Sequence, residues 1–209
     1  MNTAPSEQAR TGMILILSGP SGSGKSSIYK AAIGGLGGIE FSVSCTTRQP
    51  RPGEVDGKDY YFIPREKFDA LVAEEAFAEH AEVHGNCYGT LKSELLGRIR
   101  RGIDVLLDID VQGAAQLRAL CADSAEFCRA CEFIFIMPPS FEELERRLRA
   151  RGTETEESIL RRLANAKGEM EHAHEYDHII VNDDLDRAVQ EFTSLILGLR
   201  DRPDRKRDN

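Results

Sequence analysis

A glycine-rich octapeptide, GPSGSGKS, occupies residues 19–26 and contains the residue types that bind phosphate. It fits the pattern G-x-x-x-x-G-K-[ST] at every fixed position. Glycines let backbone N–H groups turn toward phosphate oxygens, while Lys25 can reach the outer phosphates and Ser26 can ligate Mg²⁺. The octapeptide therefore predicts a binding loop for a nucleoside triphosphate rather than a plain glycine-rich turn. The residues expected to contact this nucleotide are Gly19, Pro20, Ser21, Gly22, Ser23, Gly24, Lys25, Ser26 and Ser27.

Two carboxylates, Asp108 and Asp110, close the apolar stretch VLLDID. Proteins with such a phosphate loop commonly hold the metal water with an acid at the end of a buried strand. Alternate residues of a strand point to the same side, so both carboxylates would face one way. An acid at a strand end can instead cap the following helix. Beside the phosphate loop we favour a magnesium or substrate role for both, with Ser26 and Asp108 holding Mg²⁺ partly through water.

A proline-rich stretch, SCTTRQPRPGE at residues 44–54, places Arg48 and Arg51 three positions apart. Guanidinium groups pair with phosphate oxygens bidentately, and prolines restrict the backbone before the site is filled. Tyr60 and Tyr88, further along the chain, offer hydroxyls that can donate to the same phosphate. By itself the stretch would be taken for a solvated turn. Next to a phosphoryl donor, it predicts a second anion site for an acceptor that is itself a phosphate.

Apolar runs separated by helical patterns must position these side chains. Strands are expected at 13–18, 39–44, 59–63, 103–110, 132–137 and 178–182, and residues 76–85 are ambiguous between strand and helix. Helices are expected at 25–36, 65–75, 140–149, 153–173 and in a closing segment that ends near residue 200. Capping boxes at Ser140/Glu143 and Thr153/Glu156 mark two of the helix starts. Buried strands alternating with helices predict an α/β fold with a parallel sheet covered on both faces. Residues 45–100 depart from this pattern and predict an insertion with its own small sheet, antiparallel or mixed.

The chain has 209 residues, 41% of them hydrophobic, and a formal net charge of −8. This length suits one domain, or one domain with inserted subdomains, and the acidic balance argues against long, nonspecific contacts with nucleic acid. The longest apolar run near the start, residues 13–17, is too short for a membrane span or a signal peptide. We therefore expect a cytoplasmic protein that binds neither nucleic acid nor membrane, with disordered tails at 1–12 and 201–209.

Five cysteines are present: Cys45, Cys87, Cys121, Cys128 and Cys131. Only CRAC, at residues 128–131, has a metal-like spacing, and a zinc site needs about four ligands. We expect reduced thiols that are buried or half-buried, and the stretch CADSAEFCRAC at 121–131 has no functional interpretation.

Residues 140–162 carry six arginines and six glutamates, a balance typical of solvated, salt-bridged helices. That interpretation suits Arg146 and Arg149. Arg147 and Arg151, four positions apart, would point the same way on one helical face. Gly152 could let the segment swing, so that a closing lid brings its arginines over a transferring phosphoryl group and expels water.

Six ordered motifs resemble the guanylate kinase family, whose members phosphorylate GMP. They are SGPSGSGKSS, FSVSCTTRQPRPGEVDGKDYYF, YGT, LDIDVQG, RLRARGTETEESILRRL and VNDDLD, and the resemblance extends from about residue 13 to residue 200. It implies a P-loop kinase with a central parallel sheet flanked by helices, an inserted GMP-binding subdomain and a helical lid. The implied division is 13–44, 101–138 and 170–200 for the core, 45–100 for the GMP-binding subdomain and 139–169 for the lid.

The resemblance also implies roles for individual residues. It assigns the GMP phosphate to Arg48, Arg51, Tyr60 and Tyr88, with Glu54 supporting the arginine loop. It assigns the surroundings of guanine to Ser44, Glu79, Thr90 and Asp110, with Asp108 also on the GMP side. It assigns ATP phosphate and magnesium to Lys25 and Ser26, the lid to Arg147, Arg151 and Arg162, and the region of the ATP base to Asn182. The implied catalytic residues are Lys25, Arg48, Arg147, Arg151 and Arg162.

Guanine chemistry agrees with this assignment. Its N1–H and N2–H₂ donors can both be accepted by one carboxylate such as Glu79, and hydroxyls at Ser44 and Thr90 can donate to O6. Adenine would leave these groups unpaired, at about 1–3 kcal/mol for each buried group. The sequence alone does not bring the three residues together.

Two other functions compete with a kinase for GMP. Guanylate-kinase-like domains of scaffold proteins bind phosphopeptides without catalysis, but they usually have a degraded phosphate loop. A kinase for another nucleoside monophosphate is the third candidate, and dGMP stays open as an acceptor. The expected reaction is in-line transfer from ATP with Mg²⁺, without a general base, because a phosphate monoester of second pKa about 6 is already a nucleophile at neutral pH.

Overall fold

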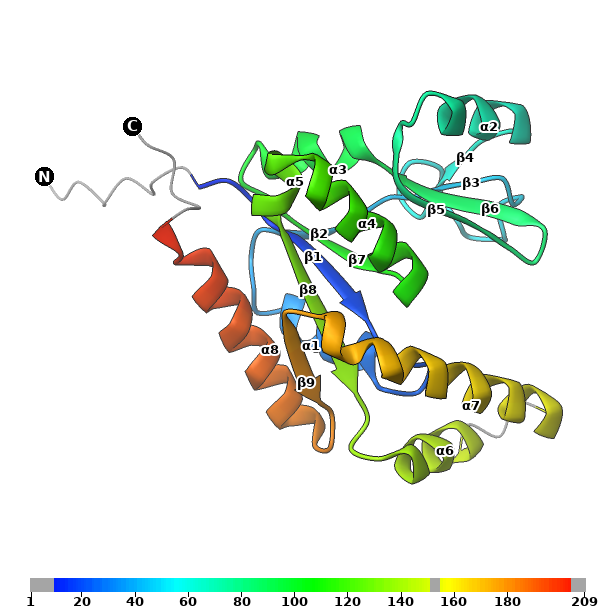
Figure 1. The fold of residues 1–209 in the computed structure, drawn as a ribbon, viewed down its shortest axis with the longest axis vertical. Coiled ribbons are helices and arrows are strands. Elements are labelled where there is room, and N and C mark those ends of the chain that lie inside the picture. The colour runs from blue at the N-terminus through cyan, green and yellow to red at the C-terminus, as the bar shows by residue number, and fades with distance from the viewer. Residues whose placement is uncertain (1–9, 151–154, 204–209) are drawn as a thin grey trace, which may run out of the picture.

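The computed structural model describes residues 10–150 and 155–203 of the chain. Helices cover both faces of a central sheet, and a smaller sheet and a helical pair project from the same side of it (Figure 1). The tails expected at 1–12 and 201–209 lie largely outside the described residues. Arg10 is described, and it belongs to the folded part, where its guanidinium pairs with Asp104.

The central sheet has five parallel strands in the order β2-β7-β1-β8-β9. The strands are β1 (Ile14–Ser18), β2 (Ile39–Phe41), β7 (Asp104–Asp108), β8 (Cys131–Met137) and β9 (His178–Val181). Every residue of β1 is fully buried, because this strand lies in the middle of the sheet between two helical layers. The expected parallel sheet is thus confirmed. The strand expected at 39–44 is shorter than predicted and ends at Phe41.

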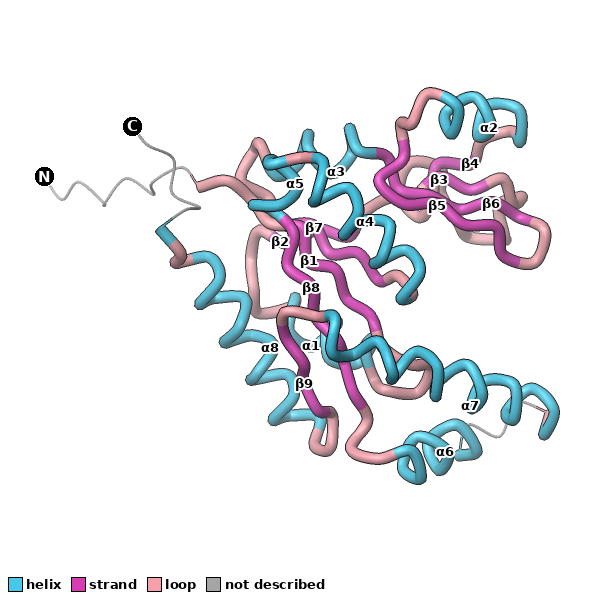
Figure 2. Tube along the Cα trace, viewed as in Figure 1, coloured by secondary structure: helices cyan, strands magenta, loops and turns pink. Residues whose placement is uncertain are grey.

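Helices cover the two faces of this sheet in two separate apolar layers (Figure 2). The first layer holds α1 (Lys25–Ile33) and α8 (Leu185–Arg200) against Leu15 and Leu17. The second holds α3 (Lys92–Ile99), α4 (Val111–Asp123) and α5 (Ala125–Ala130) against Ile14 and Ile16. Alternate residues of β1 therefore enter opposite layers, which is why its sequence is apolar throughout.

The smaller sheet has four strands in the order β4-β3-β6-β5 and is mixed. The strands are β3 (Cys45–Thr46), β4 (Tyr61–Phe62), β5 (Phe77–Val83) and β6 (Asn86–Leu91). β3 pairs with β4 in parallel, and the other pairs are antiparallel. Helix α2 (Arg65–Ala73) covers this sheet by stacking Phe68 on Phe77, with ring centroids 4.5 Å apart. The ambiguous stretch 76–85 is therefore a strand and its turn.

A helical pair, α6 (Phe141–Ala150) and α7 (Glu156–Glu171), has an apolar core of its own and continues into the 3-10 helix η1 (His172–Glu175). The Ser140 hydroxyl accepts a hydrogen bond from the Glu143 N–H at 3.2 Å, as the predicted capping box requires. The second helix starts later than expected, because Thr155 caps it by accepting from Ser158. Thr153 lies outside the described residues.

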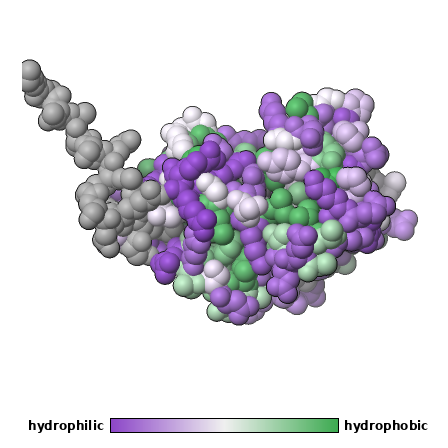
Figure 3. All heavy atoms as spheres, turned by 90° about the horizontal axis from the view of Figure 1, so that it is seen from above, coloured by the Kyte–Doolittle hydropathy of each residue, from purple (hydrophilic) through white to green (hydrophobic). Residues whose placement is uncertain are grey.

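The surface that Figure 3 shows is mainly hydrophilic, and hydrophobic side chains occupy small areas between polar ones. Among the residues that the structure describes, no helix is long and apolar enough to span a membrane.

Asp104 joins the two ends of the described chain. Its carboxylate is fully buried and accepts hydrogen bonds from Arg10 (2.6 and 2.8 Å), from Arg200 (2.8 Å) and from the Met13 N–H (2.9 Å). A buried carboxylate is stable only with such partners.

Asp104→Asn should destabilise the protein by about 3 kcal/mol, at the low end for a broken buried ion pair because both guanidinium groups are partly solvated. Urea unfolding measures the change. Asp69→Asn, which removes an exposed pair with Arg65, is the control and should change the free energy of unfolding by less than about 1 kcal/mol. Equal effects of the two substitutions would contradict the role of Asp104.

Candidate active site

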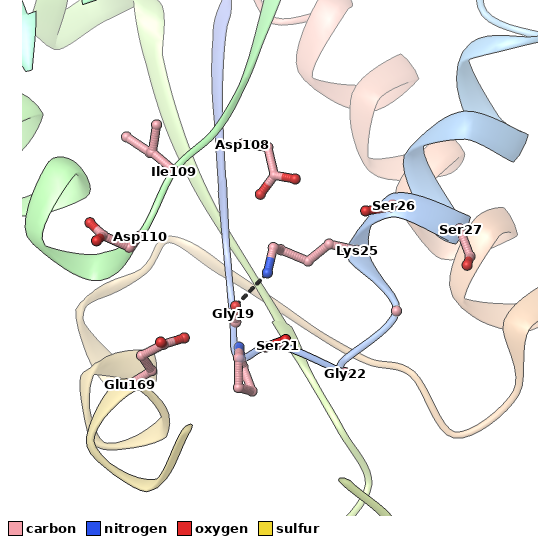
Figure 4. Close-up of a pocket in the computed structure, with 12 residues that line it drawn as sticks. Gly19, Ser21, Gly22, Lys25, Ser26, Ser27, Asp108, Ile109, Asp110 and Glu169 are labelled. Carbon is pink, nitrogen blue, oxygen red and sulfur yellow. Dashed lines mark hydrogen bonds between the residues drawn. The ribbon is translucent and has the colours of Figure 1, made fainter. Parts of the chain in front are cut away.

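A pocket of about 380 Å³ opens where β1 and β7 end (Figure 4). Leu17 pairs with Asp108, so the loop that leaves β1 and the acid that ends β7 meet at one edge of the sheet. Ligands of open α/β sheets bind at the carboxyl ends of such strands. The pocket is lined by Gly19, Pro20, Ser21, Gly22, Gly24, Lys25, Ser26, Ser27, Asp108, Ile109, Asp110 and Glu169.

Two glycines allow the backbone conformation of the glycine-rich loop and its close approach to neighbouring atoms. Gly19 has φ +141°, and a Cβ there would lie 2.3 Å from the Ile136 carbonyl oxygen. Gly24 has φ +94°, and a Cβ there would lie 2.1 Å from Nδ2 of Asn182. Helix α1 begins directly afterwards at Lys25, whose Nζ donates to the Gly19 carbonyl across the loop (Figure 4). The loop therefore folds around the Lys25 side chain. The N-terminus of α1 faces the pocket, as an anion site requires.

Asn182 lies behind this loop. Its side chain is only 4% exposed, and Nδ2 donates to the Ser23 carbonyl at 2.7 Å. Its own N–H donates to Met137 at 2.8 Å, which attaches it to the end of β8. In this structure Asn182 supports the loop, and its expected contact near a nucleotide base stays a prediction.

The two aspartates do not share one side of a strand as predicted, because β7 ends at Asp108. Asp110 is instead the N-cap of α4, where its carboxylate accepts from the Gly113 N–H at 2.9 Å. In Figure 4 Asp110 lies on the side of Glu169, whereas Asp108 lies on the side of Ser26. Burial raises the pKa of Asp108, and Lys25 opposes that rise.

A magnesium ion fits the donor set of this pocket. Ser26 supplies an exposed hydroxyl and Asp108 a carboxylate, and both line the pocket beside Lys25. Within residues 10–150 and 155–203 no three His, Cys, Asp or Glu side chains form a dedicated metal cluster. Mg²⁺ commonly keeps several waters and binds through one or two protein groups and the substrate phosphates.

The arginine loop is held together by Glu54. Its Oε1 accepts from Nη2 of Arg48 at 2.8 Å, and its Oε2 accepts from the Arg51 N–H at 2.7 Å. The Arg48 hydrogen bond holds the pKa of Glu54 below its usual range. The Arg48 guanidinium lies 5.5 Å from the centre of the Tyr60 ring, which is 6.0 Å from that of Tyr88. Four of the five predicted acceptor residues thus form one cluster, and the side chain of Arg51 is exposed beside it.

Ser44, Thr90 and Glu79 converge in the smaller sheet. Thr90 and Glu79 are register partners on β6 and β5, and the Thr90 hydroxyl donates to the Glu79 carboxylate at 2.6 Å. The Ser44 hydroxyl lies 3.0 Å from that of Thr90. Glu79 is 7% exposed, and burial raises its pKa. The Thr90 hydrogen bond opposes this rise, and the neighbouring Asp110 adds to it.

Contacts from the helical pair reach the phosphate loop. Nη2 of Arg147 donates to the Asn182 carbonyl at 2.9 Å, and Nη1 of Arg162 donates to the Ser21 hydroxyl at 2.9 Å. A Cβ on Gly22 would touch Leu144 of α6 at 3.0 Å, so the helix packs directly on the loop. Arg151, which the resemblance assigns to a lid, lies outside the described residues.

The two remaining arginines of α6 behave as solvated ion-pair residues. Arg146 is 69% exposed and pairs with Glu143, and Arg149 is 39% exposed and pairs with Glu145 and Glu156. This agrees with the sequence-based interpretation.

Sequence reasoning missed Ile109 and Glu169, which line the pocket, and Gln116, which supports the neighbouring strand. Glu169 reaches the pocket from α7, where burial raises its pKa, with Lys25 opposing the rise and Asp110 adding to it. Gln116 of α4 exchanges two hydrogen bonds with the backbone of His80, at 2.9 and 3.0 Å, and so attaches the edge strand β5 to the core beside Glu79. A lone glutamate or glutamine in a helical pattern carries no local signal of such contacts.

Comparisons with known proteins agree on one family. A family model described as guanylate kinase matches residues 11–198. The guanylate kinase of Syntrophotalea carbinolica is 52% identical, over 90% of this chain and 87% of that protein. The guanylate kinase of Geobacter sulfurreducens is 47% identical, over 90% of each chain. A crystal structure of guanylate kinase from Anaplasma phagocytophilum is 36% identical, covers 94% of this chain and 90% of that one, and has a TM-score of 0.68.

Glu79→Gln should make the ligand-free protein more stable at neutral pH. The pKa of Glu79 is raised on folding, so its ionisation opposes folding once the pH exceeds the unfolded value. The gain should shrink on acidification and vanish below about pH 4.3, where the glutamate is protonated in both states. Urea unfolding across this range tests it, with the exposed Glu82→Gln as control. A gain that does not depend on pH would contradict the role of burial.

Proposed function

The chain belongs to the guanylate kinase family, and from that premise we propose that it transfers the γ-phosphoryl group of ATP to the phosphate of GMP, and also of dGMP, with Mg²⁺. The observation that carries this proposal is the convergence of Ser44, Thr90 and Glu79 at the small sheet whose β3–β4 loop contains Arg48. This supports a guanine site and a phosphate site in one unit, beside a core that we propose binds the triphosphate.

On the donor side, we assign ATP to the pocket of residues 19–27. Backbone N–H groups of the loop and the N-terminus of α1 face the phosphates, and Lys25 exchanges its contact with the Gly19 carbonyl for phosphate oxygens. Asn182 keeps the loop in shape from behind through Ser23. Magnesium, when bound with the nucleotide at Ser26 and Asp108, would neutralise charge on the transferring group.

On the acceptor side, we assign the GMP phosphate to Arg48, Arg51, Tyr60 and Tyr88. Glu54 holds Arg48 and the backbone of Arg51 before substrate arrives, so less side-chain entropy is lost on binding. Nη1 of Arg48 donates to the Gln49 carbonyl at 2.8 Å and Nη2 donates to Glu54, and each of these nitrogens has a second N–H that we assign to the phosphate oxygens.

We assign the guanine base to the buried or half-buried residues Glu79, Thr90 and Ser44. Glu79 would accept both N1–H and N2–H₂, which stabilises the carboxylate that burial disfavours. Thr90 has a single hydroxyl proton, and it is already donated to Glu79. The 3.0 Å contact between the two hydroxyls is therefore a donation from Ser44 to Thr90, and the Ser44 hydroxyl would turn away from Thr90 to donate to O6. We place Asp110 near the base as well, because it is close enough to influence the pKa of Glu79.

Transfer itself needs charge placement rather than a general base. The GMP phosphate is already a nucleophile at neutral pH, and two anions must approach each other in line. Lys25, Arg48, Arg147 and Arg162 supply positive charge around that approach, and we add Arg151 by resemblance. Arg162 contacts Ser21 of the phosphate loop and Arg147 contacts Asn182 behind it, which supports a lid that closes over the reaction and excludes water.

We assign the working parts as predicted from the sequence. They are the core at 13–44, 101–138 and 170–200, the GMP-binding subdomain at 45–100 and the lid at 139–169. Within the subdomain range, α3 buries Leu95 and Ile99 against the central sheet, so it anchors the subdomain to the core. The proposed setting is purine nucleotide metabolism in the cytoplasm. A phosphopeptide-binding module is the second candidate, and the undamaged loop with its lysine argues against it.

An acceptor panel of GMP, dGMP, AMP, UMP and dTMP tests the reaction by ADP release from ATP. Turnover is expected with GMP and dGMP. AMP should be a much poorer acceptor, since it leaves buried groups unpaired at about 1–3 kcal/mol each. Lys25→Ala should lower kcat at least about a hundredfold without loss of fold, which shows that the activity belongs to this chain.

The panel also separates the alternatives. Binding of GMP or a phosphopeptide without turnover of any guanine nucleotide would favour the binding module. Faster turnover of AMP than of GMP would overturn the assignment of Ser44, Thr90 and Glu79.

Arg51→Ala should raise KM for GMP by about 10- to 100-fold, the loss of a charge-assisted hydrogen bond, and leave KM for ATP unchanged. Steady-state kinetics with each substrate varied measures both constants. Arg65→Ala is the matched control, because Arg65 is an exposed arginine of the same unit that pairs with Asp69 and Glu82. An unchanged KM for GMP in Arg51→Ala would remove Arg51 from the acceptor site.

A further inference from the structure

A second cavity, of about 540 Å³, lies at the opposite edge of the central sheet from the phosphate loop. Cys131 is the first residue of β8 and pairs with Ile14 at the start of β1, whereas the loop follows the ends of these strands. The size is within the range of small-molecule sites. The cavity is lined by Arg118, Cys121, Cys128, Cys131, Glu132, Phe133, Glu175, Asp177, His178 and Arg202. All three cysteines of the uninterpreted stretch 121–131 are among them.

Two of these thiols form a pair. Cys121 of α4 is half-buried and Cys131 is 7% exposed, and both side chains line this one cavity. Hydrogen bonding from the Cys131 thiol lowers the pKa of Cys121, and the same interaction raises the pKa of Cys131 together with burial. One sulfur is thus prepared to lose its proton while the other keeps it, which is the arrangement of a reactive dithiol.

Charged side chains that are held by hydrogen bonds and ion pairs surround the two cysteines. Arg118 lies three positions before Cys121 on α4, stacks over Phe133 at 4.7 Å and donates to Glu175 at 3.1 Å. Its positive charge favours the Cys121 thiolate, and Asp177 opposes it. On the other wall Glu132 pairs with His178 at 3.2 Å and with Arg202 at 2.8 Å.

The other buried cysteines provide an internal contrast. Cys45 and Cys87 pack in the core of the smaller sheet, and burial raises the pKa of Cys45 to about 11. Burial also raises the pKa of Cys87. These thiols stay protonated and enclosed, so they should react slowly. Cys128 is exposed, unlike the buried or half-buried thiols that the sequence predicted.

We propose that Cys121 and Cys131 form a thiol–disulfide exchange site whose cavity admits a small-molecule disulfide. The Cys121 sulfur attacks one sulfur of the disulfide, forms a mixed disulfide and releases the first thiolate, which takes up the proton that Cys121 lost. The Cys131 sulfur then attacks Cys121, the internal disulfide forms, and the second thiolate leaves and takes up the proton of Cys131. Two protein thiols are oxidised and one disulfide is reduced to two thiols.

A metal site is the competing use of such a cluster. Among the described residues no three metal-binding side chains of the Cys, His, Asp and Glu types are arranged for one ion. Glu132 and His178 are already engaged with each other. The placement of Cys121 and Cys131 in the lining of one cavity therefore carries the interpretation, and the exposed Cys128 has no part in it.

The test uses the reduced, full-length protein and 2-hydroxyethyl disulfide as the probe. Intact mass should show the loss of two hydrogen atoms, and peptide mapping should find Cys121 joined to Cys131. Cys121 should react at least about tenfold faster than Cys45 or Cys87. Cys131→Ser should stop the reaction at a mixed disulfide on Cys121, and Cys121→Ser should prevent the cross-link.

Cys128→Ser is the matched control, because it removes a thiol of the same cavity and should leave the cross-link and its rate unchanged. A cross-link that involves Cys128, its loss in Cys128→Ser, or a Cys121 no more reactive than Cys45 would overturn the proposal. If Cys131→Ser does not fold, the mapped cross-link and relative rates of the parent protein decide between these outcomes.

Discussion

Parallel pairing of β1 with its two neighbours is the constraint on which the site depends. Leu17 pairs with Asp108 and Ser18 with Phe135, so three adjacent strands end at one edge. One strand of a parallel sheet cannot change direction without losing the parallel hydrogen bonds to its neighbours. The chain must therefore return from the end of each strand to the start of the next through a crossover segment that passes over one face of the sheet. Backbone pairing therefore brings three features to one place: the phosphate loop, Asp108 at the end of β7 and the start of the helical pair. Side-chain contacts within the site are not needed for this placement.

Function is maintained at some expense of stability. Ser23 and Asn182 each bury a polar side-chain oxygen that has no partner among the described residues, directly behind the phosphate loop. Glu79 is a buried carboxylate whose ionisation folding disfavours. Such groups are tolerated because binding sites need polar atoms aimed at a ligand, and the apolar core around β1 supplies the stability that they lack.

Each unit of the molecule has its own apolar core, and the units are joined by polar contacts and by α3, which buries Leu95 and Ile99 in the core of the central sheet. The central sheet has two layers, the smaller sheet packs around Phe68, and the helical pair packs around Leu144. Between them lie hydrogen bonds such as Gln116 to His80 and Arg162 to Ser21. Polar junctions of this kind resemble transient interfaces, across which units can shift. This division suits a reaction that brings two anions together and then releases them.

Local patterns in the sequence determined the parts of this protein whose signals are short in range. The apolar run of β1, the start of α1 at Lys25 and the cap at Ser140 each depend on neighbours a few positions away, and all three were predicted correctly. α3, α4 and α5 were missed, and Asp110 was placed on a strand although it caps α4, because strand end and helix cap share one short sequence. Only the tertiary structure decided that Ser44 would meet Thr90, 46 positions away, and that Gln116 would hold β5. The physical reason is that such contacts are made by strand register and helix packing, which depend on the burial of the whole core and leave no trace in the spacing of the residues that they bring together.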